Sequence, residues 1–186
     1  ECVGQFSDPG ATATDNCGIA SPPSASGNTI DTHTPGTYSV TYTATDVHGN
    51  SASATRTVKV QDSTPPVLTV PVAVTAYTGV GATTCGTVVL DGVLGTATAT
   101  DNCLVTVSRS GVPPGNAFQV GSTTVTYTAV DEGGNTVSGT QIVTVFDNTP
   151  PKINGCPQNI FVVVTNDQTG SAVSWTAPTA ADNCGA

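Results

Sequence analysis

Residues 126–135 read Thr-Tyr-Thr-Ala-Val-Asp-Glu-Gly-Gly-Asn, and residues 41–50 repeat this stretch as Thr-Tyr-Thr-Ala-Thr-Asp-Val-His-Gly-Asn. Around the later copy, Val125, Tyr127 and Ala129 alternate with threonines, a pattern typical of a strand with one buried face. Each copy runs into Asp-x-x-Gly-Asn, which is a tight-turn composition, and a second alternating segment follows. The stretch therefore predicts a β-hairpin in each copy.

Two further motifs keep the same spacing of about 85 residues. Ala-Thr-Asp-Asn-Cys occupies residues 13–17 and 99–103, and residues 180–184 read Ala-Ala-Asp-Asn-Cys. Asp-x-Thr-Pro-Pro occupies residues 62–66 and 147–151. The shared period divides the chain into a first repeat that lacks its first strand, a complete second repeat and the opening third of a third repeat: residues 1–62, 63–147 and 148–186.

The second repeat also holds predicted strands at residues 67–76, 86–90, 104–108 and 117–120. Short strands separated by Gly, Pro and Asn turns are typical of sandwiches. No helical spacing of apolar residues is sustained, so we expect almost no helix. The predicted fold class is all-β, with tandem Ig-like antiparallel β-sandwiches of about 85 residues per repeat.

The charge balance excludes several functions. The net charge is −9, with 13 acidic residues against four Lys and Arg, so the surface repels nucleic acid. No run of 18 apolar residues predicts a membrane span. No candidate nucleophile is accompanied by an acid and a base in a recognisable catalytic pattern, so we expect that the protein is not an enzyme. The chain opens on Glu1 without Met, and we expect it to be a piece of something longer.

The motifs taken together resemble the HYR (hyalin repeat) family. The matching features are the Asp-x-Thr-Pro-Pro start, Cys85-Gly86 before the second strand, the Asp-Asn-Cys of residues 101–103 and the run at residues 120–135. Bacterial Ig-like repeats look similar. The resemblance covers the whole chain, and it implies an Ig-like fold in tandem on extracellular proteins, often tied to adhesion and without catalytic activity.

Six cysteines in recurring contexts favour structural disulfides and an oxidising, extracellular compartment. A bridge within each repeat is the simplest pairing, Cys2 with Cys17 and Cys85 with Cys103. Cys156 with Cys184 follows only by elimination, and HYR relatives often place a partner for a cysteine such as Cys156 further on. Free thiols or an intermolecular bridge are the alternative.

Calcium is the one cofactor with a physical rationale. In an Ig-like sandwich the entering linker, the loop after the second strand and the last hairpin turn lie at one pole, and hard cations prefer oxygen ligands. The same Asp and Asn residues also suit turns that bond their own backbone. A Cys85–Cys103 bridge would draw the Asp101 loop away from that pole. The candidate ligands are Asp62, Asp131, Asn135, Asp101, Asn102 and Asp147.

The leading hypothesis for function is a structural segment of an extracellular filament, stalk or cell-surface adhesin. The apolar segment at residues 160–164 is predicted to be a strand that could complete the first repeat of a neighbouring copy. Trp175 alternates with Val173 and is predicted to be core rather than a sugar platform. A carbohydrate- or protein-binding adhesion module, and accessory repeats of a larger secreted enzyme, remain as alternatives.

Overall fold

The computed structural model describes residues 2, 4–163, 170 and 172–185. Strands make up nearly all of its regular structure, and the two helices in the described residues have four and three residues. The elements are β1 (Ser24–Ser26), β2 (Gly36–Thr45), β3 (Ser51–Val60), β4 (Val67–Thr69), β5 (Val74–Tyr77), β6 (Gly86–Val88), α1 (Asp91–Leu94), β7 (Thr98–Thr100), β8 (Val105–Ser110), η1 (Pro114–Asn116), β9 (Ala117–Gln119), β10 (Gly121–Asp131), β11 (Thr136–Phe146), β12 (Lys152–Asn154) and β13 (Thr179–Ala181).

The chain divides into two compact units. Unit 1 comprises Glu1–Val70, Ala97–Arg109 and Thr126–Thr140, and unit 2 comprises Pro71–Thr96, Ser110–Val125 and Gln141–Ala186. The strands β10 and β11 contribute residues to both units. The repeat boundaries at residues 62/63 and 147/148 stay a prediction from the sequence.

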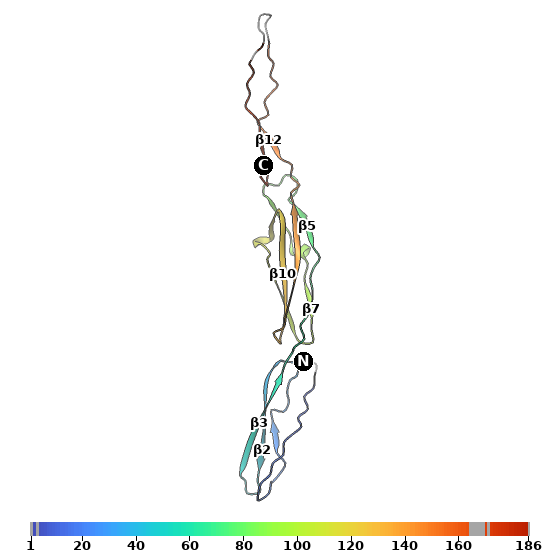
Figure 1. The fold of residues 1–186 in the computed structure, drawn as a ribbon, viewed down its shortest axis with the longest axis vertical. Coiled ribbons are helices and arrows are strands. Elements are labelled where there is room, and N and C mark those ends of the chain that lie inside the picture. The colour runs from blue at the N-terminus through green and yellow to red at the C-terminus, as the bar shows by residue number, and fades with distance from the viewer. Residues whose placement is uncertain (1, 3, 164–169, 171, 186) are drawn as a thin grey trace. The chain divides into compact units, whose positions relative to one another are not determined.

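The predicted hairpin of the first repeat lies in unit 1. Strands β2 and β3 pair antiparallel along their full length, and β1 pairs antiparallel with β2 to give the order β1-β2-β3 (Figure 1). Val40 and Tyr42 are buried, whereas Thr41 and Thr43 between them are half-exposed. The alternation of apolar residues and threonines therefore predicted this hairpin correctly.

The second repeat has a four-stranded sheet in the order β5-β11-β10-β8 and two strand pairs, β4 with β7 and β6 with β9. The strand predicted over residues 67–76 is broken: β4 pairs antiparallel with β7, whereas β5 pairs parallel with β11. The break includes Pro71, whose ring removes a backbone donor and interrupts a ladder. The expectation of antiparallel pairing is therefore wrong for β5, and the all-β class is confirmed.

The core of unit 2 is aliphatic and aromatic with one buried amide. Gln141 is 2% exposed, and its Nε2 donates to the carbonyls of Val72 and Leu94 at 2.7 and 2.8 Å. Both carbonyls belong to segments outside the strands, so the amide satisfies backbone groups that no ladder reaches. The apolar residues of this core are Val74, Val89, Leu94, Phe118, Val125, Val143 and Val145.

Two predictions for the third repeat are wrong. Trp175 is 63% exposed and lies in no strand. Residues 160–163 also form no strand, because they have no ladder partner among the described residues, and residue 164 lies outside these. No helix of the described residues has the length and apolar character needed to cross a membrane.

Candidate functional site

The hairpin turn after β10 presents the first part of the site. Asp131 ends β10, and its two carboxylate oxygens accept hydrogen bonds from the backbone N–H of Asn135 at 2.8 Å and from Asn135 Nδ2 at 2.9 Å. Burial raises the pKa of Asp131, but these bonds and those from the N–H groups of Gly133 and Gly134 outweigh it and hold the pKa below its usual value. The turn thus keeps a buried carboxylate ionised.

Asp62, the first residue of the linker at residues 62–66, lies next to this turn. This residue is 3% exposed, and its Oδ1 accepts hydrogen bonds from the Thr64 N–H at 3.1 Å and from Asn102 Nδ2 at 3.2 Å. Asn135 Nδ2 donates to the backbone carbonyl of Asp62 at 3.4 Å. A Cβ at Gly133 would lie 2.7 Å from the Asp62 Cβ, so the turn approaches the linker closely only because this residue is glycine.

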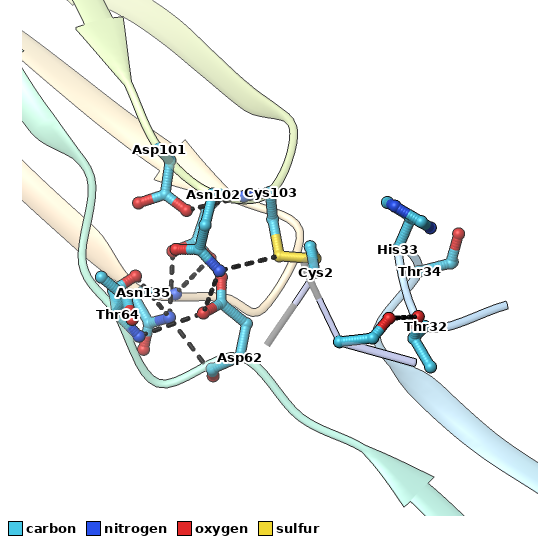
Figure 2. The surroundings of a disulfide bond; sticks show 12 residues. Cys2, Thr32, His33, Thr34, Asp62, Thr64, Asp101, Asn102, Cys103 and Asn135 are labelled. Atoms are coloured by element: carbon cyan, nitrogen blue, oxygen red, sulfur yellow. Dashed lines mark hydrogen bonds between the residues drawn. A yellow bond between two sulfur atoms is a disulfide. The ribbon is translucent and has the colours of Figure 1, made fainter. Parts of the chain in front are cut away.

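The loop before β8 supplies the third part. Asp101 Oδ1 accepts the backbone N–H of Cys103 at 2.9 Å, whereas Asp101 Oδ2 has no hydrogen-bond partner among the described residues. One carboxylate oxygen from each of Asp62, Asp101 and Asp131 lies within 4.8 Å of the other two. Figure 2 shows Asp62, Asn102 and Asn135 turned toward one another beside this loop. We call these three aspartates with Asn102 and Asn135 the carboxylate cluster.

Three oxygens of the carboxylate cluster are buried without a hydrogen-bond donor among the described residues: Asp62 Oδ2, Asp101 Oδ2 and Asn102 Oδ1. Buried polar atoms normally have a partner, because an unpaired one carries the full cost of desolvation. All three are acceptors, so a cation or a donor would satisfy them together. Five of the six predicted ligands thus lie in one place within unit 1.

Asp147, the sixth predicted ligand, lies in unit 2 in a similar setting. Its Oδ1 accepts hydrogen bonds from the Thr149 N–H at 3.0 Å and from Thr78 Oγ1 at 2.8 Å, and these bonds hold its pKa below the usual value. An oxygen of Asp182 lies within 4.8 Å of one from Asp147, and Asn183 Nδ2 reaches Asp147 Oδ1 at 3.4 Å. The sequence-based candidates did not include Asp182 and Asn183, although the third Asp-Asn-Cys copy marks them.

The cysteines do not pair as predicted. Disulfides join Cys2 to Cys103 and Cys85 to Cys184, whereas Cys17 and Cys156 are free and exposed. Each bond therefore links the Asp-Asn-Cys cysteine of one repeat to the first cysteine of the repeat before it. The predicted Cys2–Cys17, Cys85–Cys103 and Cys156–Cys184 bridges are wrong, because equivalent places in the sequence do not make two cysteines neighbours in space.

The observed bond also removes a conflict in the sequence-based prediction. A bridge to Cys85 would draw the Asp101 loop away from Asp62 and Asp131. The bond to Cys2 instead leaves the loop with them, and an Asp62 oxygen lies within 4.8 Å of both sulfurs. The disulfide and the carboxylate cluster are thus neighbours in unit 1 (Figure 2).

Comparison with known proteins gives two family matches. The family described as HYR domain matches residues 61–145 and 146–186, and the family described as bacterial surface protein, Ig-like domain, matches residues 3–60. Two proteins named hyalin, from Strongylocentrotus purpuratus and Lytechinus variegatus, are each 40% identical over 97% of this chain. The chain spans only 15% and 34% of their respective lengths.

Among solved structures, the extracellular cadherin domains 3–6 of protocadherin gamma B7 and gamma B2 match 81% and 71% of the chain. These matches cover 44% and 37% of the two protocadherin chains, with identities of 19% and 14%. The TM-scores are 0.28 and 0.25, too low to carry weight for fold or function.

Proposed function

We propose, since this chain belongs to the HYR domain family, that it is a non-enzymatic structural segment of an extracellular filament, stalk or cell-surface adhesin. The observation that supports this most is the Cys2–Cys103 disulfide, which ties the first repeat covalently to the second. Structural disulfides form and persist in oxidising compartments, so a place outside the cell accords with it. Repeats stapled to one another resist separation better than repeats joined by linkers alone.

Localisation and stiffness test this proposal. Antibodies against the chain should label intact, unpermeabilised cells of the source organism. Small-angle scattering should show a broader distribution of interatomic distances after reduction, because the staples between repeats are lost. Labelling only after permeabilisation would contradict the extracellular location, and unchanged scattering would contradict the structural role of the staples. The complete polypeptide sequence would show whether the repeats are instead accessory to a secreted enzyme.

We further propose that the carboxylate cluster holds Ca²⁺. Calcium takes six to eight oxygen ligands from carboxylates, amide and backbone carbonyls and water. Asp62 is nine-tenths buried with one oxygen unpaired, and Asp101 and Asn102 add two more unpaired oxygens. The amide nitrogen of Asn102 is held by Asp62 Oδ1, so its oxygen is the end left for a ligand. A cation would also relieve the repulsion among three neighbouring carboxylates.

Calorimetric titration of the EDTA-treated chain with CaCl₂ tests this site. We expect heat of binding and a rise in melting temperature, since a ligand that binds only the folded state stabilises it. If the titration shows no heat of binding and the melting temperature does not change, the proposal is wrong.

The partners we propose first are neighbouring repeats or copies of the same kind. Among the described residues, β3 pairs only with β2, so its outer edge has free backbone groups. A cavity of about 290 Å³ at the end of β3 is lined in part by Phe6, Val58 and Val60. Residues 160–163 alternate between half-exposed Ile160 and Val162 and more exposed Phe161 and Val163. This apolar segment would suit the edge of β3 in another copy.

Phe161→Asp and Val163→Asp test strand complementation without altering the edge that accepts the strand. Sedimentation should show the wild-type chain in head-to-tail oligomers and both variants as monomers. A wild-type chain that stays monomeric at every concentration would contradict head-to-tail association.

Glycan binding is the second candidate function, and exposed Trp175 is the observation that favours it. An accessible indole face can stack on a sugar ring. A glycan array should then give signals that Trp175→Ala abolishes and Phe161→Ala retains. Signals that survive Trp175→Ala would exclude this residue as the platform.

A further inference from the structure

We propose that Cys17 is the site of a covalent cross-link to the first cysteine of another HYR repeat, which would precede the first repeat in the array. The inference rests on the proposed tandem array and adds a bonding partner to it. Two observations carry it: the disulfides formed by the two cysteines equivalent to Cys17, and the repetition of their surroundings around Cys17.

All three Asp-Asn-Cys copies hold the cysteine in the same way. The backbone N–H of Cys17 donates to Asp15 Oδ1 at 2.8 Å, and the corresponding bonds at Cys103 and Cys184 are both 2.9 Å. Cys103 and Cys184 are each bonded to a cysteine that lies 101 and 99 residues earlier, respectively. Cys17, the remaining cysteine of the set, is exposed and free. The same position is therefore bonded wherever a preceding repeat is present.

The neighbouring turn repeats as well. The Val47 N–H donates to the carbonyl of Gly18 at 3.3 Å, as the Glu132 N–H donates to that of Leu104 at 3.0 Å. Asp46 accepts two bonds from Asn50, at 2.9 Å from its N–H and 2.7 Å from Nδ2, as Asp131 does from Asn135. The first repeat therefore presents the same loop and turn beside Cys17 that the second repeat presents beside the Cys2–Cys103 bond.

One residue differs between the two turns. His48 occupies the place of Gly133, where a Cβ would lie 2.7 Å from the Cβ of the linker aspartate. A preceding linker thus cannot approach the first repeat as closely as Asp62 approaches the second. Cys17 keeps the covalent contact, and we expect no cation site of the same geometry there.

The partner must come from outside the six cysteines of this chain. Cys2 and Cys85 hold the first-cysteine position, and both are already bonded. Cys156 occupies a different position: it precedes Pro157 as Val70 precedes Pro71. Val70 Cγ1 would lie 2.7 Å from a Cβ at Gly139, so this position faces a late strand of its own repeat.

The bond forms by oxidation of two thiols. Each thiol loses one proton, and the pair gives two electrons to a disulfide oxidant, which is reduced to two thiols. In the first step the Cys17 thiolate attacks the oxidant and releases one thiol. The partner thiolate then attacks the mixed disulfide and releases the second, so atoms and electrons balance.

Peptide mapping without reduction provides the test. The protein isolated from its source is blocked with N-ethylmaleimide and digested with pepsin at low pH, where disulfides do not exchange. We expect the Cys17 peptide to be linked to a peptide whose cysteine is none of the six in this chain. The recombinant chain serves as the reference, and its Cys17 should carry the maleimide. Maleimide on Cys17 in the natural protein, or a bond to Cys156, to glutathione or to a second Cys17, would overturn the proposal.

A matched pair of variants in the full-length protein adds a second readout. Cys17→Ser should unmask one new reactive thiol, and its peptide identifies the partner. Cys156→Ser should leave that thiol blocked. If no new thiol appears in the Cys17→Ser variant but antibodies still label the cell surface, the cross-link proposal is wrong and the proposed extracellular array is unaffected.

Discussion

Cys2 and Cys103 are joined by a disulfide with their Cα atoms 5.1 Å apart, although 101 residues separate them in the chain. The half-cystines are 2% and 8% exposed, and Asp62 lies beside both sulfurs. A bond that closes so long a loop restricts the unfolded chain strongly. The bond thus joins the first two repeats covalently and also lies next to the carboxylate cluster.

Replacing this disulfide should destabilise unit 1. For a loop of about 100 residues the chain-entropy treatment gives about 4.7 kcal/mol, and measured losses on removing native disulfides are roughly 2–5 kcal/mol. We expect Cys2→Ser with Cys103→Ser to lower the free energy of unfolding by an amount in this range, measured by urea unfolding. Cys17→Ser is the matched control and should change it by less than about 0.5 kcal/mol. An equal loss in the control would favour a Cys2–Cys17 bond instead.

Asp62→Asn should weaken calcium binding. The substitution keeps the size of the side chain and removes one of three neighbouring negative charges, so we expect at least a tenfold higher Kd, about 1.4 kcal/mol. Titration calorimetry measures it. Asp46→Asn is the control, because Asp46 sits in the same kind of turn with no described cluster of carboxylates around it. Identical Kd values for Asp62→Asn and the wild-type chain would exclude Asp62 as a ligand.

The hairpins could be predicted from the sequence, because Val40 and Tyr42 alternate with threonines and the residues that follow have a composition specific for a tight turn. It also predicted that Asp62 and Asp131 lie together, since a sandwich brings linker and turn to one pole, whereas the predicted Cys85–Cys103 bridge argued against Asp101, which the structure places with them. It did not reveal the pairing of Cys103, because local similarity cannot show which cysteine of which repeat lies nearby.

The acid stability of the chain should depend on Asp131. Although burial raises its pKa, hydrogen bonds from Asn135 and the turn N–H groups keep the folded-state pKa below the unfolded value of about 3.9. The ionised group therefore contributes stability above about pH 4, and this contribution disappears as the pH falls through the folded-state pKa. Asn135→Ala removes the largest of the lowering effects and should raise the pKa of Asp131.

Carbon-13 NMR of the carboxyl group during an acid titration measures that pKa directly. Asn28→Ala, at an exposed position in unit 1, is the control and should leave the titration of Asp131 unchanged. A pKa in the Asn135→Ala variant equal to that of the wild type would show that the side-chain bond does not stabilise the ionised form.

Gln141 should be the most sensitive polar residue of the unit 2 core. Its amide donates to the carbonyls of Val72 and Leu94, and it is 2% exposed. Gln141→Leu fills a similar volume and leaves both carbonyls without this donor, at a cost of about 1–3 kcal/mol for each unsatisfied group. Gln141→Glu should cost more, because an ionised carboxylate would face two carbonyl oxygens. Urea unfolding at neutral pH measures both, with Gln119→Leu at an exposed position as control. If Gln141→Leu unfolds at the wild-type urea concentration, water must replace the amide, and the side chain does not hold these segments in place.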